Sequence, residues 1–412
     1  MIDRLNERAR LGRLALSTGL IGALLLIAAG PAAAAYSDTA DPGTWGTNGR
    51  VRAIARSTDG TRIYLGGDFT AVKIPGGSQT RPANHIVALD AVTGAEDPTF
   101  DASLDGNVYA LEYANGIVYA GGFFTNANGA PHNKIVALDG ATGATEASFD
   151  ITANFPVRAL ELSGDNLYMG GSFTKVFKGA TAKSRTRLAA INLPAATVDT
   201  TWQPKANKDV RALQLSRDGF HMYAGGDFTT ITNGATVNSQ FALASISTTT
   251  GVFDDSFRPT VDANPAFCGN GCVMDLATDG TRVYAGVGGK EPGNMLLAVE
   301  AATGADVWRR VGDGDFQAVD VQGDWVYGGG HFTSIGGNPA YVKFVTVDAA
   351  TGDFRTDQFK PTVNSSLGVW DILAEPEEFR APGSKLYIGG DFTKVSTQNK
   401  FRFASFTDDG QP

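Results

Sequence analysis

The stretch IYLGGDFT, Ile63 to Thr70, recurs with small changes along a chain of 412 residues. The further copies are VYAGGFFT from Val118, LYMGGSFT from Leu167, MYAGGDFT from Met222, VYGGGHFT from Val326 and LYIGGDFT from Leu386. In every copy a tyrosine, a glycine pair and a phenylalanine keep their places, while the residue after the glycines varies. Recurrence of this kind is typical of proteins that repeat one supersecondary unit.

Each repeating unit holds four short segments suited to β-strands. In the second unit we expect them at Val108–Tyr113, Ile117–Gly122, Lys134–Asp139 and Thr145–Phe149, separated by glycine-containing turns. The units begin at Val51, Val108, Val157, Val210, Val273, Phe316 and Val369, which lie 57, 49, 53, 63, 43 and 53 residues apart. These spacings and short strands predict the blades of a β-propeller.

The last unit lacks its fourth strand, and a candidate replacement lies at the other end of the chain. The segment Asp41–Trp45 ends in Thr44-Trp45, as the fourth strands elsewhere end in Thr99-Phe100 and Thr201-Trp202. An unpaired edge strand would invite aggregation. We therefore predict an all-β fold, a seven-bladed β-propeller of four-stranded antiparallel blades whose last blade is closed by the N-terminal strand. It would form a single domain over residues 41–412, after a linker at 36–40.

The first 35 residues have the features of a secretory signal peptide. Four arginines (Arg4, Arg8, Arg10 and Arg13) precede the apolar stretch Leu14–Gly30, and Pro31–Ala35 offers small residues for cleavage. The alternative is a membrane anchor, but the apolar stretch is about the minimum spanning length and contains Ser and Thr. We expect removal of residues 1–35, a secreted, extracellular protein, and no stable membrane insertion afterwards. The sequence does not indicate an oligomeric state.

The net charge excludes one class of partner, and the cysteines predict a disulfide. The formal net charge of −9 argues against nucleic acid, whose phosphates need a basic surface. The two cysteines, Cys268 and Cys272, lie in CGNGC, which predicts a small disulfide loop in an exported protein. A metal site there would be incomplete, because the sequence places no histidine nearby.

The repeated YxGGxFT stretch and the φφALDxxTG stretch that follows it resemble the delta-60 repeat of secreted bacterial β-propellers. The resemblance covers residues 41 to 412 and implies a seven-bladed propeller. It implies no catalytic residues. The fifth unit departs from the pattern, since it reads VYAGVGGKEPGN from Val283 and lacks the Phe-Thr pair.

The recurring residues themselves suit structural roles. The tyrosine would pack between blades with its hydroxyl bonded, the glycines would allow close backbone approach, and the phenylalanine would fill the core. At the variable place, Asp68, Asp227 and Asp391 would accept backbone N–H bonds in the turn. Phe123, Ser172 and His331 occupy the same place, which disfavours a metal ligand shared by all units.

Residues that break the repeat are better candidates for a binding site. The second residue of each unit is expected at one mouth of a central channel: Arg52, Tyr109, Arg158, Arg211, Met274, Gln317 and Trp370. Arginine clamps carboxylate or sulfate, and an aromatic face can stack on a sugar, so we predict ligand binding by Arg52, Tyr109, Arg158, Arg211 and Trp370. The alternative is that the arginines turn sideways and pair with acids such as Asp209 or Glu161.

The same face should carry the irregular loops. These are Lys73–His85, Lys175–Arg187 and the cysteine-bearing link Val261–Cys272. Variable loops on one face often carry function, although plain solvated loops are the common case.

Catalytic patterns are sparse. The four histidines fall in different units, and neither a G-x-S-x-G motif nor a P-loop occurs. Asp275 and Asp371 share one repeat position, with Asp320 two residues further along in its own unit, and channel carboxylates could serve a lyase or hydrolase. Acids bonded to backbone are the alternative, and Ca²⁺ held by channel carboxylates is another. Otherwise we expect no cofactor.

Together these features predict a secreted binding or interaction module for a carbohydrate or a surface protein. A secreted polysaccharide lyase or glycoside hydrolase and a protein–protein scaffold without a small-molecule site are the alternatives.

Overall fold

The structure is a computed structural model that describes residues 36–76, 80–261, 273–289, 293–355, 359–375 and 383–408. These residues belong to one compact unit, and every regular element in them is a β-strand. No helix within these ranges is long and apolar enough to cross a membrane. The predicted all-β fold class is therefore confirmed.

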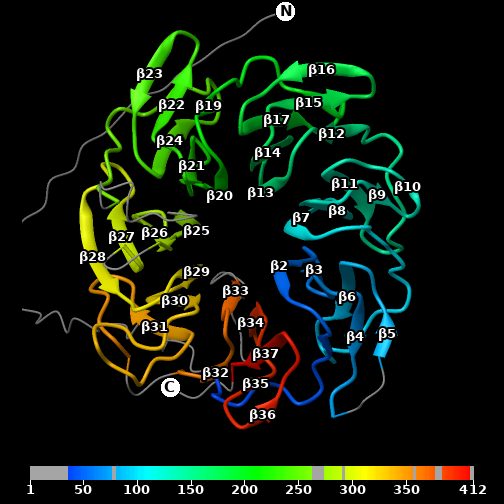
Figure 1. The fold of residues 1–412 in the computed structure, drawn as a ribbon, viewed down its shortest axis with the longest axis vertical. Helices are drawn as coiled ribbons and strands as arrows, with labels where there is room; N and C mark the ends of the chain where they lie inside the picture. The colour runs from blue at the N-terminus through cyan, green and yellow to red at the C-terminus, as the bar shows by residue number, and fades with distance from the viewer. Residues whose placement is uncertain are drawn as a thin grey trace, which may run out of the picture. The chain divides into compact units, whose positions relative to one another are not determined.

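Each of the seven sequence units forms an antiparallel sheet (Figure 1). The first strand of each unit is called the inner strand below: β2 (Val51–Arg56), β7 (Val108–Ala114), β13 (Val157–Ser163), β20 (Val210–Leu215), β25 (Val273–Thr278), β29 (Phe316–Gln322) and β33 (Val369–Ala374). The middle strands are β3 (Arg62–Gly67), β8 (Ile117–Gly122), β14 (Asn166–Gly171), β21 (His221–Gly226), β26 (Arg282–Val287), β30 (Trp325–Gly330) and β34 (Lys385–Gly390). The third strands are β6 (Ile86–Asp90), β11 (Ile135–Asp139), β17 (Leu188–Asn192), β24 (Leu243–Ser247), β27 (Met295–Glu300), β31 (Phe344–Asp348) and β37 (Phe403–Thr407).

The expected fourth strand forms in only two of these sheets, as β18 (Thr197–Val198) and β28 (Asp306–Val311). Elsewhere the segment makes a single bridge, such as Leu89 with Glu96, and then turns away. The turn has a local cause in the first unit, where Asp97 Oδ1 accepts the N–H of Thr99 at 2.9 Å and its hydroxyl at 2.7 Å. The prediction of four strands in every unit is thus corrected to three strands and a capped turn in most described sheets.

The loop after each YxGGxFT stretch is mostly a short hairpin rather than an irregular insertion. In most units it pairs with the link that enters the inner strand. These smaller sheets contain β1 (Gly46–Thr47), β4 (Ala71–Lys73) and β5 (Thr80–Pro82); β9 (Asn126–Ala127) and β10 (Ala130–Pro131); β12 (Ile151–Ala153), β15 (Lys175–Lys178) and β16 (Thr181–Ser184); β19 (Lys205–Ala206), β22 (Thr230–Asn233) and β23 (Thr236–Ser239); and β32 (Val363–Asn364), β35 (Lys394–Val395) and β36 (Gln398–Asn399).

An asparagine or aspartate ahead of the inner strand ties this link to the Phe-Thr pair. Asn154 Oδ1 accepts the N–H groups of Thr174 and Lys175 at 3.0 and 2.9 Å. Asp105 accepts the corresponding N–H groups of Thr125 and Asn126 at 2.7 and 2.9 Å. The threonine of the repeated stretch is therefore a capped turn residue.

Each glycine of the repeated pair makes room for a different neighbour. A Cβ at Gly66 would lie 2.5 Å from Cγ1 of Val108, the first inner-strand residue of the next unit. A Cβ at Gly67 would lie 2.0 Å from the carbonyl oxygen of Arg50 in its own unit. Between the last and first units, Gly389 meets Val51 in the same way, with a Cβ placed 2.6 Å from its Cγ1. The close approach expected at these glycines is confirmed.

The tyrosine and phenylalanine of the stretch lie in the core between units, as predicted. Tyr64 is fully buried, its ring lies 5.4 Å from that of Phe100, and its hydroxyl donates to the carbonyl of Gly140 in the next unit at 2.8 Å. The six phenylalanines are at most 1% exposed: Phe69, Phe124, Phe173, Phe228, Phe332 and Phe392. The repeat therefore encodes contacts between successive sheets.

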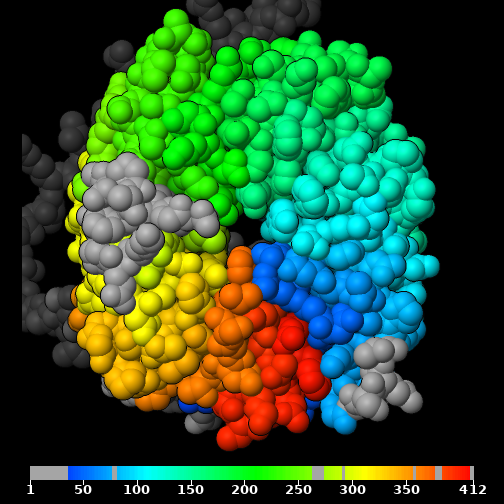
Figure 2. All heavy atoms as spheres, viewed as in Figure 1, coloured from blue at the N-terminus to red at the C-terminus, as the bar shows by residue number. Residues whose placement is uncertain are grey.

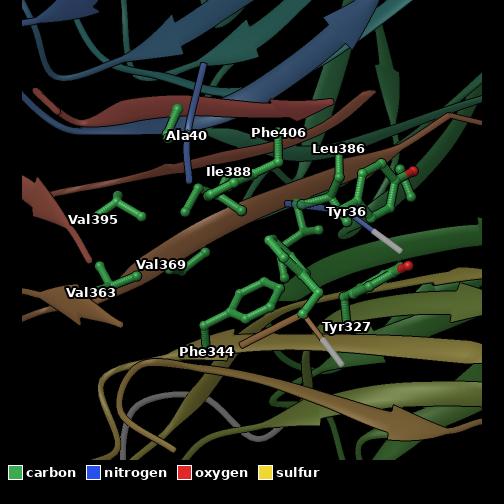
Figure 3. Close-up of a cluster of buried hydrophobic side chains, with 14 of the residues drawn as sticks. Tyr36, Ala40, Tyr327, Phe344, Val363, Val369, Leu386, Ile388, Val395 and Phe406 are labelled. Atoms are coloured by element: carbon green, nitrogen blue, oxygen red, sulfur yellow. The ribbon is translucent and has the colours of Figure 1, made fainter. Parts of the chain in front are cut away.

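The segment before β1 lies beside β37, the third strand of the last sheet. The N–H of Asp41 donates to the Ser405 carbonyl at 2.8 Å, and the Asp41 carboxylate accepts the hydroxyls of Ser405 and Thr407 at 2.7 and 2.8 Å. Tyr36 and Ala40 are buried in the core of that sheet (Figure 3). Residues 36–40 were predicted to be a linker, but Tyr36 and Ala40 of this segment point into the core.

The inner strands contact one another in chain order, from β2 to β33, and β33 also contacts β2. Figure 1 shows them nearest the middle of the view. Side chains of the inner strands therefore lie beside those of neighbouring units, and this is where the candidate site lies.

Candidate functional site

A backbone irregularity recurs at the start of every inner strand. The pairing with the middle strand slips by one residue between the first and third inner-strand positions, for example between Val51 and Ala53. The second residue is thereby bulged, and a bulge re-aims its side chain. The structure brings all seven bulged residues together around one small cavity of about 90 Å³: Arg52, Tyr109, Arg158, Arg211, Met274, Gln317 and Trp370. We call these seven residues the ring.

The ring has the membership that the repeat register predicts. Figure 2 shows a small hollow near the middle of the view, bordered by segments of β2 in blue and β33 in orange. All five residues predicted to bind a ligand, Arg52, Tyr109, Arg158, Arg211 and Trp370, are in the ring.

Each ring arginine is engaged by a carboxylate. Arg52 Nε lies 2.6 Å from Asp68 Oδ1, Arg158 Nε lies 3.3 Å from Asp209 Oδ2, and Arg211 Nε lies 2.9 Å from Asp227 Oδ1. The alternative pairing of arginine with Asp209 is thus confirmed, whereas Glu161 instead accepts the Leu215 N–H at 2.9 Å. These pairs balance the positive charge at the ring.

These pairs also correct the role predicted for the variable place of YxGGxFT. Asp68 and Asp227 bind arginine side chains, where backbone N–H bonds in the turn were expected. The physical reason is that the backbone N–H of Asp68 donates to the Arg50 carbonyl at 2.8 Å, just before the inner strand. This bond sets the side chain at the variable place next to the ring residue of its own unit.

The aromatic ring residues are bridged by arginines. The Arg52 guanidinium carbon lies 4.4 Å from the centroid of Trp370 and 5.4 Å from that of Tyr109. Arg158 contacts Tyr109 from the other neighbouring unit at 5.5 Å. These four side chains form a continuous cation–π row across half of the ring. Tyr109 and Trp370 are both half-buried, so part of each remains accessible.

Exposed apolar side chains flank the ring. Phe155 and Leu367 each stand two residues before an inner strand and are 53% and 40% exposed, and Phe123 at the variable place of its unit is 55% exposed. The ring end of the inner strands therefore combines balanced charges with accessible aromatic surface.

Below the ring, the inner strands line a larger cavity of about 270 Å³ that is bordered by carboxylates, and we call it the central cavity. Both oxygens of Asp275 accept backbone N–H groups, from Leu276 at 2.9 Å and from Val319 of the next unit at 2.8 Å. Asp371 likewise binds the N–H groups of Ile372 and Ile54, at 2.9 and 2.5 Å. The two catalytic candidates thus tie neighbouring inner strands together, which was the alternative interpretation.

Glu161 and Asp320 also accept an N–H group from the next inner strand. Asp320 accepts the N–H groups of Val321 and Ala374, both at 2.7 Å. Burial raises the pKa of Asp275 to about 6 and those of Glu161 and Asp320 to about 7, with Asp275 as an additional negative neighbour of the latter two. Burial, with other acids nearby, also raises the pKa of Asp371 well above its usual value.

The sequence missed Glu112, which lines the same cavity. Its pKa is raised well above the usual value by burial and by Glu161 and Asp371. A usable signal was present, because Glu112 and Glu161 occupy the same inner-strand position in consecutive units.

Metal ligation finds no support in the described ranges, where no group of three or more His, Cys, Asp or Glu is placed to hold an ion. The predicted disulfide of Cys268 and Cys272 lies outside the described residues, as does most of the link Val261–Cys272.

Comparison with known proteins gives a likeness of fold only. No family model matches the chain. No curated protein matches it either. Among 1112 matching chains of solved structures is the computationally designed Ika8 protein, in a crystal of space group P63. Its TM-score is 0.50 at 12% identity, over 90% of this chain and 98% of that one.

Proposed function

We propose that the chain is a secreted, seven-bladed β-propeller that acts as a binding module, with the ring as its binding site and a carbohydrate or a surface protein as its ligand. The contact of β33 with β2 and the fit of Gly389 against Val51 support closure of the blades. The resemblance of the repeats to the delta-60 repeat supports the same architecture.

The observation that carries the proposed site is the convergence of seven bulged residues on one cavity. Bulges commonly re-aim side chains beside functional sites. The ring arginines are already paired with Asp68, Asp209 and Asp227, so an anionic ligand would have to compete with these carboxylates. We therefore favour an uncharged carbohydrate, which would stack on Tyr109 or Trp370 and accept hydrogen bonds from the guanidinium groups.

A catalytic role is assigned neither to Asp275 nor to Asp371. A general acid or base needs an oxygen within hydrogen-bond reach of substrate, whereas both oxygens of each residue accept backbone N–H groups. The protein-partner alternative draws on a separate observation, the exposed Phe123, Phe155 and Leu367 beside the ring.

A glycan array combined with a polysaccharide-degradation screen tests the proposal on the chain from Tyr36 onward. We expect glycan binding without product release. Trp370→Ala and Tyr109→Ala should each weaken it at least about fivefold, because each removes an aromatic face for the sugar, and stacking of a nucleic-acid base on such a face is worth about 1–3 kcal/mol. Phe220→Ala is the matched control, since Phe220 is 64% exposed at the opposite end of its inner strand.

Melting temperatures of all variants should stay near that of the parent. Product release would favour the enzyme alternative, while capture of a protein partner without any glycan signal would favour the scaffold. Glycan binding that survives both ring substitutions would overturn the assignment of the site.

A further inference from the structure

A second cavity lies at the opposite end of the inner strands β2, β7 and β33. Its volume of about 350 Å³ is within the range of about 300–1,000 Å³ that is usual for small-molecule sites. Apolar side chains form most of its wall, among them Ile54, Leu111 and Leu373. Such a wall offers burial to a small hydrocarbon group.

A small residue of the repeat lines this cavity. The fifth inner-strand residue is Ala55 in β2, whereas β7, β13 and β29 have Glu112, Glu161 and Asp320 at this place. Ala55 lines the cavity together with Glu112, between β7 and β33; β25 also has an alanine, Ala277, at this place.

Glu112 is the polar group at the boundary between the two cavities, and it lines both. The other acids of the central cavity accept N–H bonds from a neighbouring inner strand. In the described part of the chain, the Glu112 carboxylate instead has the N–H of the adjacent Tyr113 as its bonding partner. Its remaining bonding capacity therefore faces the cavities.

The charges around this cavity favour a cation. Glu161 from β13 and Asp371 from β33 add negative potential at Glu112. Arg56 from β2 is the basic group in the wall, and its Nε lies 3.4 Å from Glu375 Oε1 of β33, so this pair is locally balanced. An anion would meet unfavourable potential at Glu112, and a neutral molecule would gain no charge pairing there.

We propose that this cavity binds a small organic amine in its ammonium form, with the ammonium group on Glu112 and the hydrocarbon group against Ile54, Leu111 and Leu373. The site is separate from the ring and does not depend on the function proposed for the ring. When Glu112 is protonated, binding releases that proton to solvent and leaves an ammonium–carboxylate pair. Affinity therefore rises with pH while the amine, like a lysine side chain, stays charged up to about pH 9.

Calorimetric titration with n-butylamine, and with n-butanol as its uncharged isostere, tests this at pH 5 and pH 8. We expect n-butylammonium to bind more tightly than n-butanol by at least about tenfold at pH 8, because hydrogen bonds to a charged group contribute about 1.5–3 kcal/mol. The preference should shrink at pH 5. Equal affinity for both probes, or no binding of n-butylamine at either pH, would overturn the proposal.

Three variants locate the effect. Glu112→Gln should reduce n-butylammonium affinity at pH 8 at least about tenfold. Ala55→Leu, which fills the cavity, should abolish binding of both probes and keeps the proposal testable if Glu112→Gln fails to fold. Glu146→Gln is the control, because it makes the same exchange at an acid that lines neither cavity and should leave n-butylammonium binding at pH 8 unchanged. Unaltered affinity in folded Glu112→Gln or Ala55→Leu protein would contradict the site.

Discussion

At the scale of single residues, the fixed and the variable places of YxGGxFT have different physical origins. Tyrosine recurs at a buried place in every unit, and in several units the next unit offers its hydroxyl a carbonyl. Tyr64, Tyr168 and Tyr223 donate to Gly140, Thr248 and Ala301 at 2.8, 3.0 and 3.1 Å. In three units the variable place instead binds the ring arginine of its own unit: Asp68, Ser172 and Asp227 bind Arg52, Arg158 and Arg211. A change there alters the ring while the contacts between units stay intact.

One tyrosine allows this account to be tested by a matched pair. Tyr64→Phe should destabilise the fold by about 1 kcal/mol, because it removes a buried hydrogen bond and leaves the Gly140 carbonyl without its donor. Tyr387→Phe should be neutral or stabilising, because the buried Tyr387 hydroxyl has no hydrogen-bond partner in the described part of the chain. Urea unfolding of both variants measures the difference. Equal losses in the two would mean that the hydroxyl bond contributes nothing.

At the scale of elements, the inner strands are held together by side chains rather than by backbone pairing. Each inner strand pairs with one strand of its own sheet, so its other edge has N–H groups that need acceptors. Carboxylates supply them, as where Asp371 of β33 binds the N–H of Ile54 in β2. Desolvation of these acids raises their pKa values, so the arrangement is more favourable when some are protonated.

The sequence could predict the positions of these strands and the membership of the ring, because both follow from the register of a repeat. It could not predict the pairing of Arg52 with Asp68, since that depends on the bulge and on where the turn sets the Asp68 side chain. The role of the acids could not be predicted for a similar reason. In the sequence, Asp275 and Asp371 fit a catalytic role and a structural role equally well, and only their N–H partners in the structure decide between the two. The fourth strands failed for a local reason, because a capped turn at residues such as Asp97 ends pairing early.

Glu161→Gln tests how much folding stability is lost when an acid buried between inner strands becomes charged. The folded pKa of Glu161 is about 7, above the unfolded value of about 4.3. The contribution of such an acid to folding stability is complete below about pH 4 and is lost as the pH rises to 7. The reason is that the acid loses its proton in the unfolded chain at a lower pH than in the folded protein. Glutamine keeps an oxygen for the Leu215 N–H and does not titrate. The variant should match the parent at pH 4 and exceed its unfolding free energy at pH 8 by on the order of 4 kcal/mol.

Chemical denaturation at several pH values provides the measurement. Glu146→Gln, at an acid outside the central cavity, serves as the control and should show no comparable pH-dependent gain. A stability difference between Glu161→Gln and parent that stays constant from pH 4 to pH 8 would contradict the raised pKa.

At the scale of the whole molecule, the first and last parts of the chain depend on each other. Residues 36–45 contribute the buried Tyr36 and Ala40 and the Asp41 bonds to β37, while Val51 occupies the space left by Gly389. Among the described residues, these are the contacts between parts of the chain most distant in the sequence. If these contacts join the last sheet to the first, the N-terminal segment should stabilise the entire fold and not only its own surroundings.

Deleting residues 36–45 from a chain that otherwise begins at Tyr36 tests this directly. We expect a loss of on the order of 3 kcal/mol or more, from the burial of Tyr36 and the lost hydrogen bonds of Asp41. The exposed edge of β37 should also promote self-association, which size-exclusion chromatography would detect. Thr39→Ala, at an exposed residue of the same segment, is the control and should leave stability unchanged. Addition of a peptide with the sequence of residues 36–45 should restore part of the lost stability, because the same contacts can form between separate chains. A shortened protein that unfolds at the parent's urea concentration and remains monomeric would rule out closure by this segment.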